Sequence, residues 1–287
     1  MVSSMVNKIP LLGLLVLIVS LPACRQLDPT LNVMSFNIRY NNPADGEHAW
    51  PNRRDRVASV IRFHKTDLIG MQEVLRDQIS DLEILLPQYG WVGVGRDDGK
   101  NGGEFSPIFY RKDRFTVLDS GTFWLSETPE VIGSKSWDAA ITRIANWVIL
   151  LDLQSNQEFL YLNTHFDHRG EVARTNSAAL IVARLKNLAR GRPVLVGGDF
   201  NVPPTAPAYE TMTSALDDSY IKTATAPHGP LGTFGGFEVG STANEQRIDY
   251  VFVDPTFQVL RYAALSDQWD GSYPSDHLPV LVELSWE

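Results

Sequence analysis

Six apolar, strand-like runs of this chain each end in a short polar segment, and this repeated ending is the strongest constraint on its fold. Such a run is typical of a buried strand, so the polar groups fall where the strand passes into a loop. The segments are Ser35-Phe36-Asn37, Gln72-Glu73, Thr164-His165, Gly198-Asp199-Phe200-Asn201, Arg247-Ile248-Asp249-Tyr250 and Ser275-Asp276-His277. Oxygen and imidazole groups on rigid strand ends are typical of a hydrolytic site that uses a hard metal ion.

Between these segments, extended and helical patterns alternate without a linker or an internal repeat. The spacing of apolar residues predicts helices over 53–64, 77–86 and 171–189. It predicts strands over 31–40, 67–71, 89–95, 105–110, 115–122, 145–153, 159–165, 194–199, 247–253, 259–266 and 280–283. Many strands and few helices in one unbroken run indicate two packed sheets with helices outside. We therefore predict one domain over 31–287, preceded by a tether at 24–30.

The first 23 residues have the pattern of an export signal. Lys8 supplies the positive charge, and the apolar stretch 9–19 is too short to span a bilayer. Cys24 follows Leu21-Pro22-Ala23, which resembles the bacterial lipobox and implies cleavage before Cys24 and lipid attachment to its sulfur. An incidental thiol is the alternative, but Cys24 is the only cysteine of the chain. We predict an exported monomer, anchored by lipid to the bacterial cell envelope.

The charge balance bears on possible partners. The chain has 25 Lys and Arg against 34 Asp and Glu, a net charge of −9. A protein that binds long nucleic acid through its phosphates usually carries a basic face, whereas the basic clusters 53–56 and 111–114 each contain an acid. Nucleic acid is therefore not the favoured partner. A nuclease is not excluded, because a bound cation changes the local field.

The segment 194–201 carries the clearest local signal. Residues two apart on an extended segment point to the same side, so Asp199 and Asn201 can face one ligand. Taken alone, this pair also suits a simple turn at the end of a strand. Asp249 lies in an otherwise apolar strand, where a carboxylate is costly unless it is paired or binds metal; Arg247 is the simple partner.

The motifs together resemble those of the endonuclease/exonuclease/phosphatase superfamily, which includes deoxyribonuclease I. The resemblance rests on SFN (35–37), QE (72–73), GGDFN (197–201) and SDHLPV (275–280), in that order, and covers residues 31–287. It implies an α/β fold, a four-layer α/β/β/α sandwich with the site where the strand-end loops of both sheets converge. It also implies hydrolysis of a phosphoester with Mg²⁺, for which Mn²⁺ is a possible substitute.

The resemblance implies a role for each matching residue. Glu73 is the principal metal ligand, Asn37 contacts metal or phosphate, and Asp276 supports the metal or the neighbouring His277. Asp199 orients and deprotonates the attacking water, and Asn201 holds the phosphate or that water.

The other implied roles concern phosphate and its surroundings. His277 and His165 face the phosphate, Asp249 orients one of these histidines, and Glu104 is the acid partner of His165. Arg143 precedes a strand and could clamp phosphate through two hydrogen bonds; a salt bridge to Asp138 or Glu127 is the alternative.

The expected substrate is a small or lipid-derived phosphoester, cleaved outside the cytoplasm by direct attack of water. An exported nuclease is the alternative within the same chemistry. A binding protein without catalysis on the same fold is a third interpretation, since a fold alone does not guarantee activity.

Overall fold

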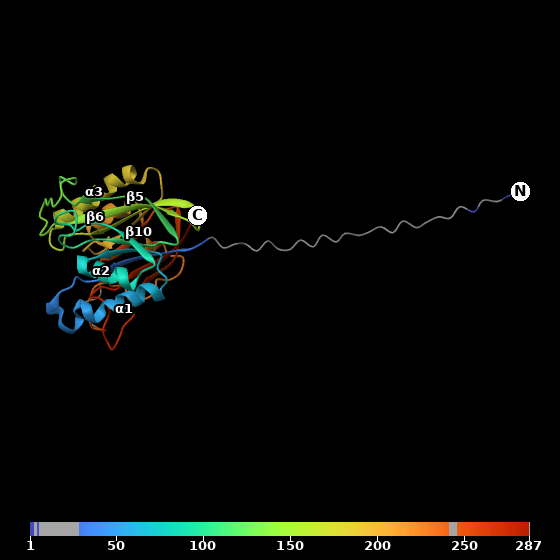
Figure 1. Ribbon diagram of the computed structural model, residues 1–287. Coiled ribbons are helices and arrows are strands. Elements are labelled where there is room, and N and C mark those ends of the chain that lie inside the picture. Colours follow the sequence, from blue (N-terminus) through green and yellow to red (C-terminus); the bar gives the residue numbers. More distant parts are fainter. Residues whose placement is uncertain (3–4, 6–28, 241–245, 287) are drawn as a thin grey trace.

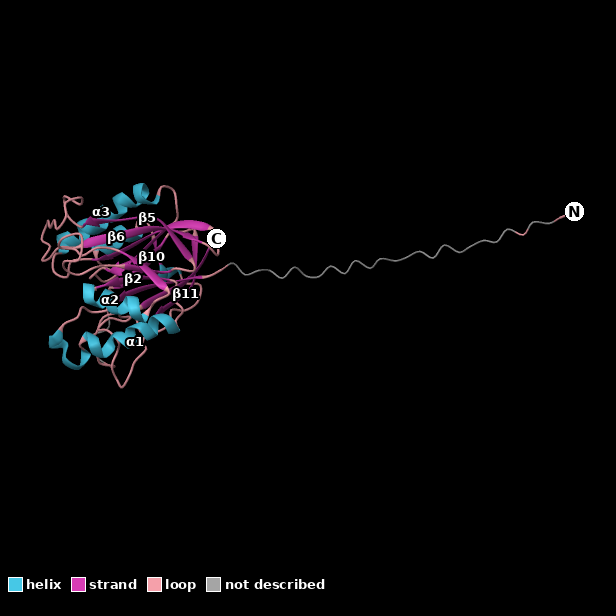
Figure 2. Ribbon diagram, in the orientation of Figure 1, coloured by secondary structure: helices cyan, strands magenta, loops and turns pink. Residues whose placement is uncertain are grey.

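The computed structural model describes residues 1–2, 5, 29–240 and 246–286. The predicted lipidation site Cys24 and most of the predicted signal and tether lie outside these ranges. Two six-stranded sheets form the centre of the molecule (Figures 1 and 2). The first has the order β11 (Phe257–Ala264), β12 (Val280–Trp286), β1 (Leu31–Asn37), β2 (Leu68–Gln72), β4 (Ile108–Arg111), β3 (Tyr89–Val92). The second has the order β5 (Phe115–Trp124), β6 (Ile144–Asp152), β7 (Gln157–His165), β8 (Val194–Asp199), β10 (Asp249–Val253), β9 (Asp217–Asp218).

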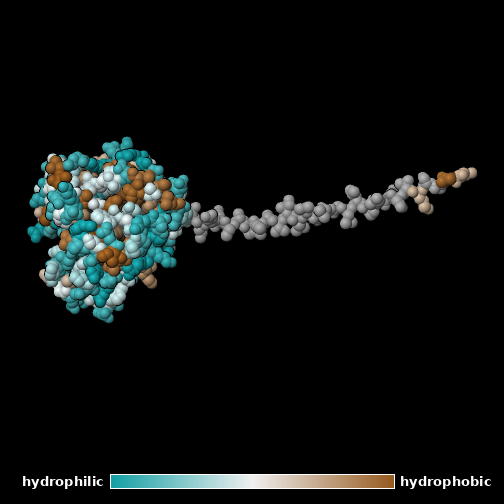
Figure 3. All heavy atoms as spheres, in the orientation of Figure 1, coloured by the Kyte–Doolittle hydropathy of each residue, from teal (hydrophilic) through white to brown (hydrophobic). Residues whose placement is uncertain are grey.

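Helices cover the outer faces of the two sheets, α1 and α2 on one side and α3 on the opposite side (Figure 1). Their bounds are η1 (Pro43–His48), α1 (Trp50–Phe63), α2 (Arg76–Leu85), α3 (Glu171–Ala189), α4 (Pro207–Thr213) and α5 (Ser219–Lys222). Of the helices in the described ranges, none has the length and apolar character needed to cross a bilayer. The surface seen in Figure 3 is mainly hydrophilic, with apolar residues in smaller patches.

Three separate apolar cores confirm the four-layer sandwich. One core lies between the sheets, where Val33 of β1 and Val148 of β6 belong to the same cluster. A second joins the outer face of the first sheet to α1 and α2, and a third joins the second sheet to α3 and α4. Apolar residues on both faces of a strand explain why the central strands read as almost continuous apolar runs.

The strand directions bring the polar segments to one edge. β1 runs parallel to β2, and β7 runs parallel to β8, so these four central strands deliver their carboxyl ends in pairs. β10 is antiparallel to β8 and begins opposite its end, with Asp249 paired to Asp199. β12 is antiparallel to β1, so the segment before it, which includes His277, lies near the end of β1.

A polar link joins the two sheets just below that edge. Gln72 donates to Oδ1 of Asn163 at 2.7 Å, and Asn163 donates to the carbonyl of Met71 at 2.7 Å, all within the interior. Gly70 lies beside this link, and a Cβ there would stand 2.5 Å from Oδ1 of Asn163. Only glycine leaves room for the link. The link fixes the end of β2 relative to the end of β7, and with them the polar segments that follow these strands.

Candidate active site

The chain turns sharply as soon as three of the polar segments leave their strands. Arg39, Glu73 and Asn201 have positive φ angles of 56°, 61° and 51°. This left-handed conformation is unfavourable for residues other than glycine and is typical of functional sites, where surrounding contacts maintain it. The turns direct the groups of both sheets into one cavity.

Asn37 connects the two sheets at the centre of the site. Its side chain is fully buried, and Nδ2 donates to Oε1 of Glu73 at 3.2 Å and to Oδ2 of Asp199 at 3.0 Å. Its Oδ1 accepts from the backbone N–H of Arg39 at 3.0 Å. Asn37 therefore joins the carboxylate predicted to bind metal to the carboxylate predicted to activate water. Its amide hydrogens, rather than its oxygen, face these groups, and metal ligation by Asn37 stays a prediction.

His277 lies between two carboxylates. Its Nδ1 is 2.9 Å from Oδ2 of Asp249, and its Nε2 is 3.8 Å from Oδ2 of Asp199. Asp249 thus makes the orienting contact that the sequence predicted. Arg247, the simple alternative partner of Asp249, instead binds both carboxylate oxygens of Asp218 at 2.9 and 2.6 Å.

Burial and these contacts change the pKa values of Asp199 and His277. Burial, with the charge of Asp249, raises the pKa of Asp199 to about 7. Burial lowers the pKa of His277, but Asp249 and Asp199 outweigh it and raise the pKa to about 10. A carboxylate that titrates near neutral pH beside a cationic imidazole suits a base that removes a proton from water, because general bases work best near the ambient pH.

The second imidazole, His165, is held differently. Its Nε2 lies 3.0 Å from Nδ2 of Asn201 and 3.3 Å from Oδ2 of Asp199. Burial and the charge of Arg143 hold the pKa of His165 well below its usual range, so this ring is neutral. Its predicted pairing with Glu104 is wrong.

Glu104 shares the cavity but has another partner. Its carboxylate lies 2.8 Å from Nη1 of Arg96, eight residues earlier, and Nδ1 of His165 has no hydrogen-bond partner among the described residues. The guanidinium is the stronger partner because it offers a charge-assisted hydrogen bond that a neutral imidazole cannot match. Glu104 therefore orients Arg96 rather than His165.

Arg143 is a buried cation without a carboxylate partner. Only 6% of it is exposed, and among the described residues no carboxylate lies within 4.0 Å of its guanidinium. Its Nη2 is 3.4 Å from Nδ1 of His168, and its Nε has no hydrogen-bond partner. Asp138, the alternative partner, instead accepts backbone N–H groups at the start of α3. A buried guanidinium with free donors is suited to an anion.

The cavity around these groups has a volume of about 580 Å³. Sequence reasoning missed several residues that line it, among them Arg39, Tyr40 and Phe234. The Phe234 ring packs 4.8 Å from the His277 ring although 43% of the residue is exposed. A neighbouring backbone hydrogen bond, from Leu278 N–H to the carbonyl of Thr233 at 2.7 Å, fixes this segment. No motif marks it; only its position in a loop that the sequence left unassigned could have drawn attention.

The donors at this edge fit a divalent cation. Glu73 and Asp276 both lie within 4 Å of the Arg39 guanidinium, so two carboxylates converge there. Asp199, Asp249 and His277 form a second group whose candidate ligand atoms all lie within 4.8 Å of one another. Oxygen-rich donor sets of this kind suit a hard ion, which would neutralise negative charge on phosphoryl oxygens.

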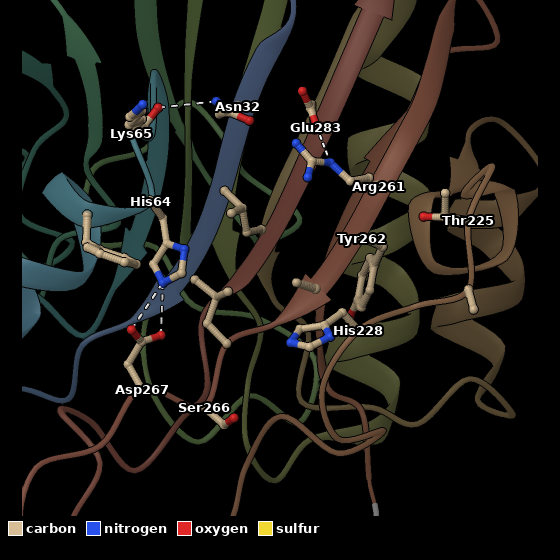
Figure 4. Close-up of a pocket in the computed structure, with 15 residues that line it drawn as sticks. Asn32, His64, Lys65, Thr225, His228, Arg261, Tyr262, Ser266, Asp267 and Glu283 are labelled. Atoms are coloured by element: carbon tan, nitrogen blue, oxygen red, sulfur yellow. Dashed lines mark hydrogen bonds and ion pairs between the residues drawn. The ribbon is translucent and has the colours of Figure 1, made fainter.

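A second large cleft, of about 650 Å³, lies on the outer face of the first sheet (Figure 4). His64 at the end of α1 binds Asp267 at 2.9 Å, and Arg261 of β11 binds Glu283 of β12. His228 faces the same space from the opposite side. None of the predicted catalytic or metal-binding residues lines this cleft.

Known proteins resemble this chain over most of its length. The profile of the Endonuclease/Exonuclease/phosphatase family matches residues 34–277. The structure of a mannosyl-6-phosphatase from Bacteroides thetaiotaomicron is 41% identical and has a TM-score of 0.85, with 89% of this chain and 100% of that one covered. The human nocturnin catalytic domain with bound sulfate is 22% identical and has a TM-score of 0.71, with 90% and 94% covered, which shows the shared fold alone.

Another relative is longer than this chain. An uncharacterised protein of Acanthamoeba polyphaga mimivirus is 25% identical over 222 residues, or 64% of this chain. The match spans 32% of that protein, about a third of its length. The family profile, the similarity to the phosphatase and the geometry of the cavity lead to one conclusion. The chain belongs to the endonuclease/exonuclease/phosphatase family and is a metal-dependent phosphoester hydrolase.

Proposed function

We propose that this protein is a Mg²⁺-dependent phosphomonoesterase that removes a terminal phosphate from a phosphorylated sugar outside the cytoplasm. The mannosyl-6-phosphatase, at 41% identity over its full length, supports the sugar class. The exposed Phe234 ring beside His277 supports it too, because an aromatic wall can pack against the apolar face of a sugar ring. Mg²⁺ is the expected ion because the donors are mainly oxygen atoms.

The observation that carries the monoester assignment is the buried guanidinium of Arg143. A terminal phosphate has three non-bridging oxygens and up to two negative charges, whereas a diester has two such oxygens and one charge. His165 and Asn201 lie next to Asp199, and Arg143 adds a cationic donor in the same cavity. A free buried cation is better satisfied by the doubly charged monoester.

The residues of the cavity have separate tasks in hydrolysis. Asp199 accepts a proton from water as the water oxygen bonds to phosphorus and the bond to the sugar oxygen breaks. The sugar oxygen then takes a proton from solvent. Asn201 and Arg143 hold phosphoryl oxygens, and His277, kept cationic by Asp249, stabilises their negative charge. When bound, the divalent ion contributes Lewis-acid stabilisation of the same charge.

Lipid anchoring is part of the proposal and is supported by the N-terminal sequence, in which Cys24 follows an apolar export-like segment. The Cys24→Ser variant is expected to lose membrane association in fractionated cells. A variant that stays with the membrane to the same extent would contradict the anchor without affecting the enzymatic assignment.

The enzymatic test compares three substrates with Mg²⁺ or Mn²⁺. We expect phosphate release from mannose 6-phosphate, much slower hydrolysis of bis-p-nitrophenyl phosphate, and intact plasmid DNA. Rapid cleavage of the diester or of the plasmid would favour the nuclease alternative. No hydrolysis of any substrate with either ion would favour a binding protein on this fold.

A further inference from the structure

Arg39 places a fixed positive charge among the carboxylates of the catalytic cavity. Its guanidinium donates to both oxygens of Asp45, at 3.1 and 3.0 Å. The same group lies 3.8 Å from Oε2 of Glu73 and 3.9 Å from Oδ2 of Asp276. Three carboxylates therefore surround one guanidinium, and two of them are the predicted metal ligands.

Several contacts hold this cation in place. The backbone N–H of Arg39 donates to Asn37, and its carbonyl accepts from Arg53 at 2.6 Å and from Gln78 at 2.9 Å. The guanidinium also lies 4.4 Å from the centre of the Tyr40 ring. A side chain fixed at both its backbone and its charged end loses little further freedom when it acts as a counter-ion.

The carboxylates around Arg39 are grouped as closely as those that bind a pair of metal ions. Two-metal phosphoesterase sites bring carboxylates together so that two cations can lie about 4 Å apart. Asp45, Glu73 and Asp276 would supply enough negative charge for such a pair, but the guanidinium already neutralises part of it. A fixed cation at this distance also repels a second divalent ion.

We infer that the guanidinium of Arg39 takes the place of a second metal ion, so that the catalytic centre holds one divalent cation. The inference rests on the metal dependence in the proposed function and adds the number of ions. Its test counts bound ions and needs no substrate.

The experiment is calorimetric titration of the metal-free protein with Mn²⁺. We expect one ion per wild-type chain, two per chain in Arg39→Ala, and one in Arg39→Lys, which keeps the charge. Arg39→Gln, which can still donate to Asp45, is expected to bind two and is a second neutral variant if Arg39→Ala does not fold. Arg143→Ala is the matched control because it removes another cation of the same cavity; it should bind one ion.

Electron paramagnetic resonance gives an independent readout. Bound Mn²⁺ should show the spectrum of an isolated ion in the wild type and a spin-coupled pair in Arg39→Ala. Two ions in the wild type, or one in both neutral variants, would overturn the inference. Absence of Mn²⁺ binding in every variant would overturn it together with the metal dependence. One ion in the wild type and two in the neutral variants, without sugar phosphate hydrolysis, would support it and contradict only the proposed substrate.

Discussion

The catalytic cavity and the outer cleft have similar volumes, about 580 and 650 Å³, but their charged groups are arranged differently. In the outer cleft, His64 pairs with Asp267, and their side chains are 20% and 28% exposed. In the catalytic cavity, Asp199 is 1% exposed and contacts Asn37, His165 and the backbone of Asn201.

This difference shows that burial and shared contacts, rather than volume, identify the reactive cavity. A partly exposed pair is solvated by water, which screens its charges. Buried groups that share partners determine one another's protonation, so the pKa of Asp199 rises to about 7 while that of His277 rises to about 10. Catalysis should therefore depend on residues of the catalytic cavity and not on those of the outer cleft.

The largest expected effect is that of Asp199→Asn. The amide has nearly the same shape as the carboxylate but cannot accept the proton of water, so kcat should fall by about 10³-fold, within the range for loss of general-base catalysis. Phosphate release under saturating substrate measures it. His64→Ala in the outer cleft is the matched control and should keep its kcat. Near-normal turnover by Asp199→Asn would contradict the assignment of this cavity.

A smaller effect is expected for Glu73→Gln, which acts on the metal. Removing the charge of a predicted ligand should raise the Mg²⁺ concentration for half-maximal activity by more than about tenfold. Loss of a residue that only hydrogen-bonds to a metal ligand already lowers metal affinity by about tenfold or more. Asp267→Asn removes one carboxylate from the outer cleft and serves as the control. An unchanged Mg²⁺ dependence in Glu73→Gln would exclude this carboxylate as a ligand.

The pH dependence of kcat and of stability should follow residues of the catalytic cavity rather than those of the outer cleft. Because Asp199 must be ionised to accept a proton, kcat should decrease about tenfold per pH unit below its pKa of about 7. The Asp199 and His277 pKa values lie above their ordinary values of 3.8 and 6.5, so the native state binds extra protons. His165, whose pKa lies well below its usual range, offsets the contribution of Asp199 below about pH 6.5. In the metal-free protein, the free energy of unfolding should therefore fall mainly as pH rises from about 7 to 10, through the window set by His277.

Rate and melting-temperature profiles between pH 5 and 9 measure these effects. The acid limb of the rate should be absent from the residual activity of Asp199→Asn, and the same variant should lose part of the decline in stability. A melting temperature that rises between pH 7 and 9 in the metal-free wild type would contradict the raised pKa of His277. The His64→Ala control should show both wild-type profiles.

Sequence patterns predicted the parts of the molecule that depend on local order. Helix α3 and strand β8 have the bounds that the apolar spacing predicted, because Arg190 adopts a left-handed cap after α3 and the two glycines of 197–198 continue a fully buried strand. Helix α1 begins at Trp50 rather than at residue 53, since Pro51 suits a first turn. The short helices α4 and α5 have too few turns to show periodicity.

The sequence predicted the site less evenly. Asp199 and His277 lie in motifs that place them directly at strand ends, so their position followed from the order of the chain. The Arg39 contacts join residues 34 and 237 positions away, and no local pattern encodes such distances. The assignment of Glu104 to His165 failed for a different reason. Arg96 lies only eight residues before Glu104, and its guanidinium forms a charge-assisted pair with the Glu104 carboxylate in place of the expected imidazole contact.

The smallest effect is expected in the outer cleft itself. Asp267→Asn breaks the pair with His64, whose charges are partly solvated, so the free energy of unfolding should change by less than about 1 kcal/mol. Urea denaturation measures this change, and phosphate release should match the wild type. A loss of turnover above tenfold in this variant, with stability preserved, would mean that the outer cleft influences catalysis. The distinction between the two cavities would then depend on coupling across the first sheet rather than on burial alone.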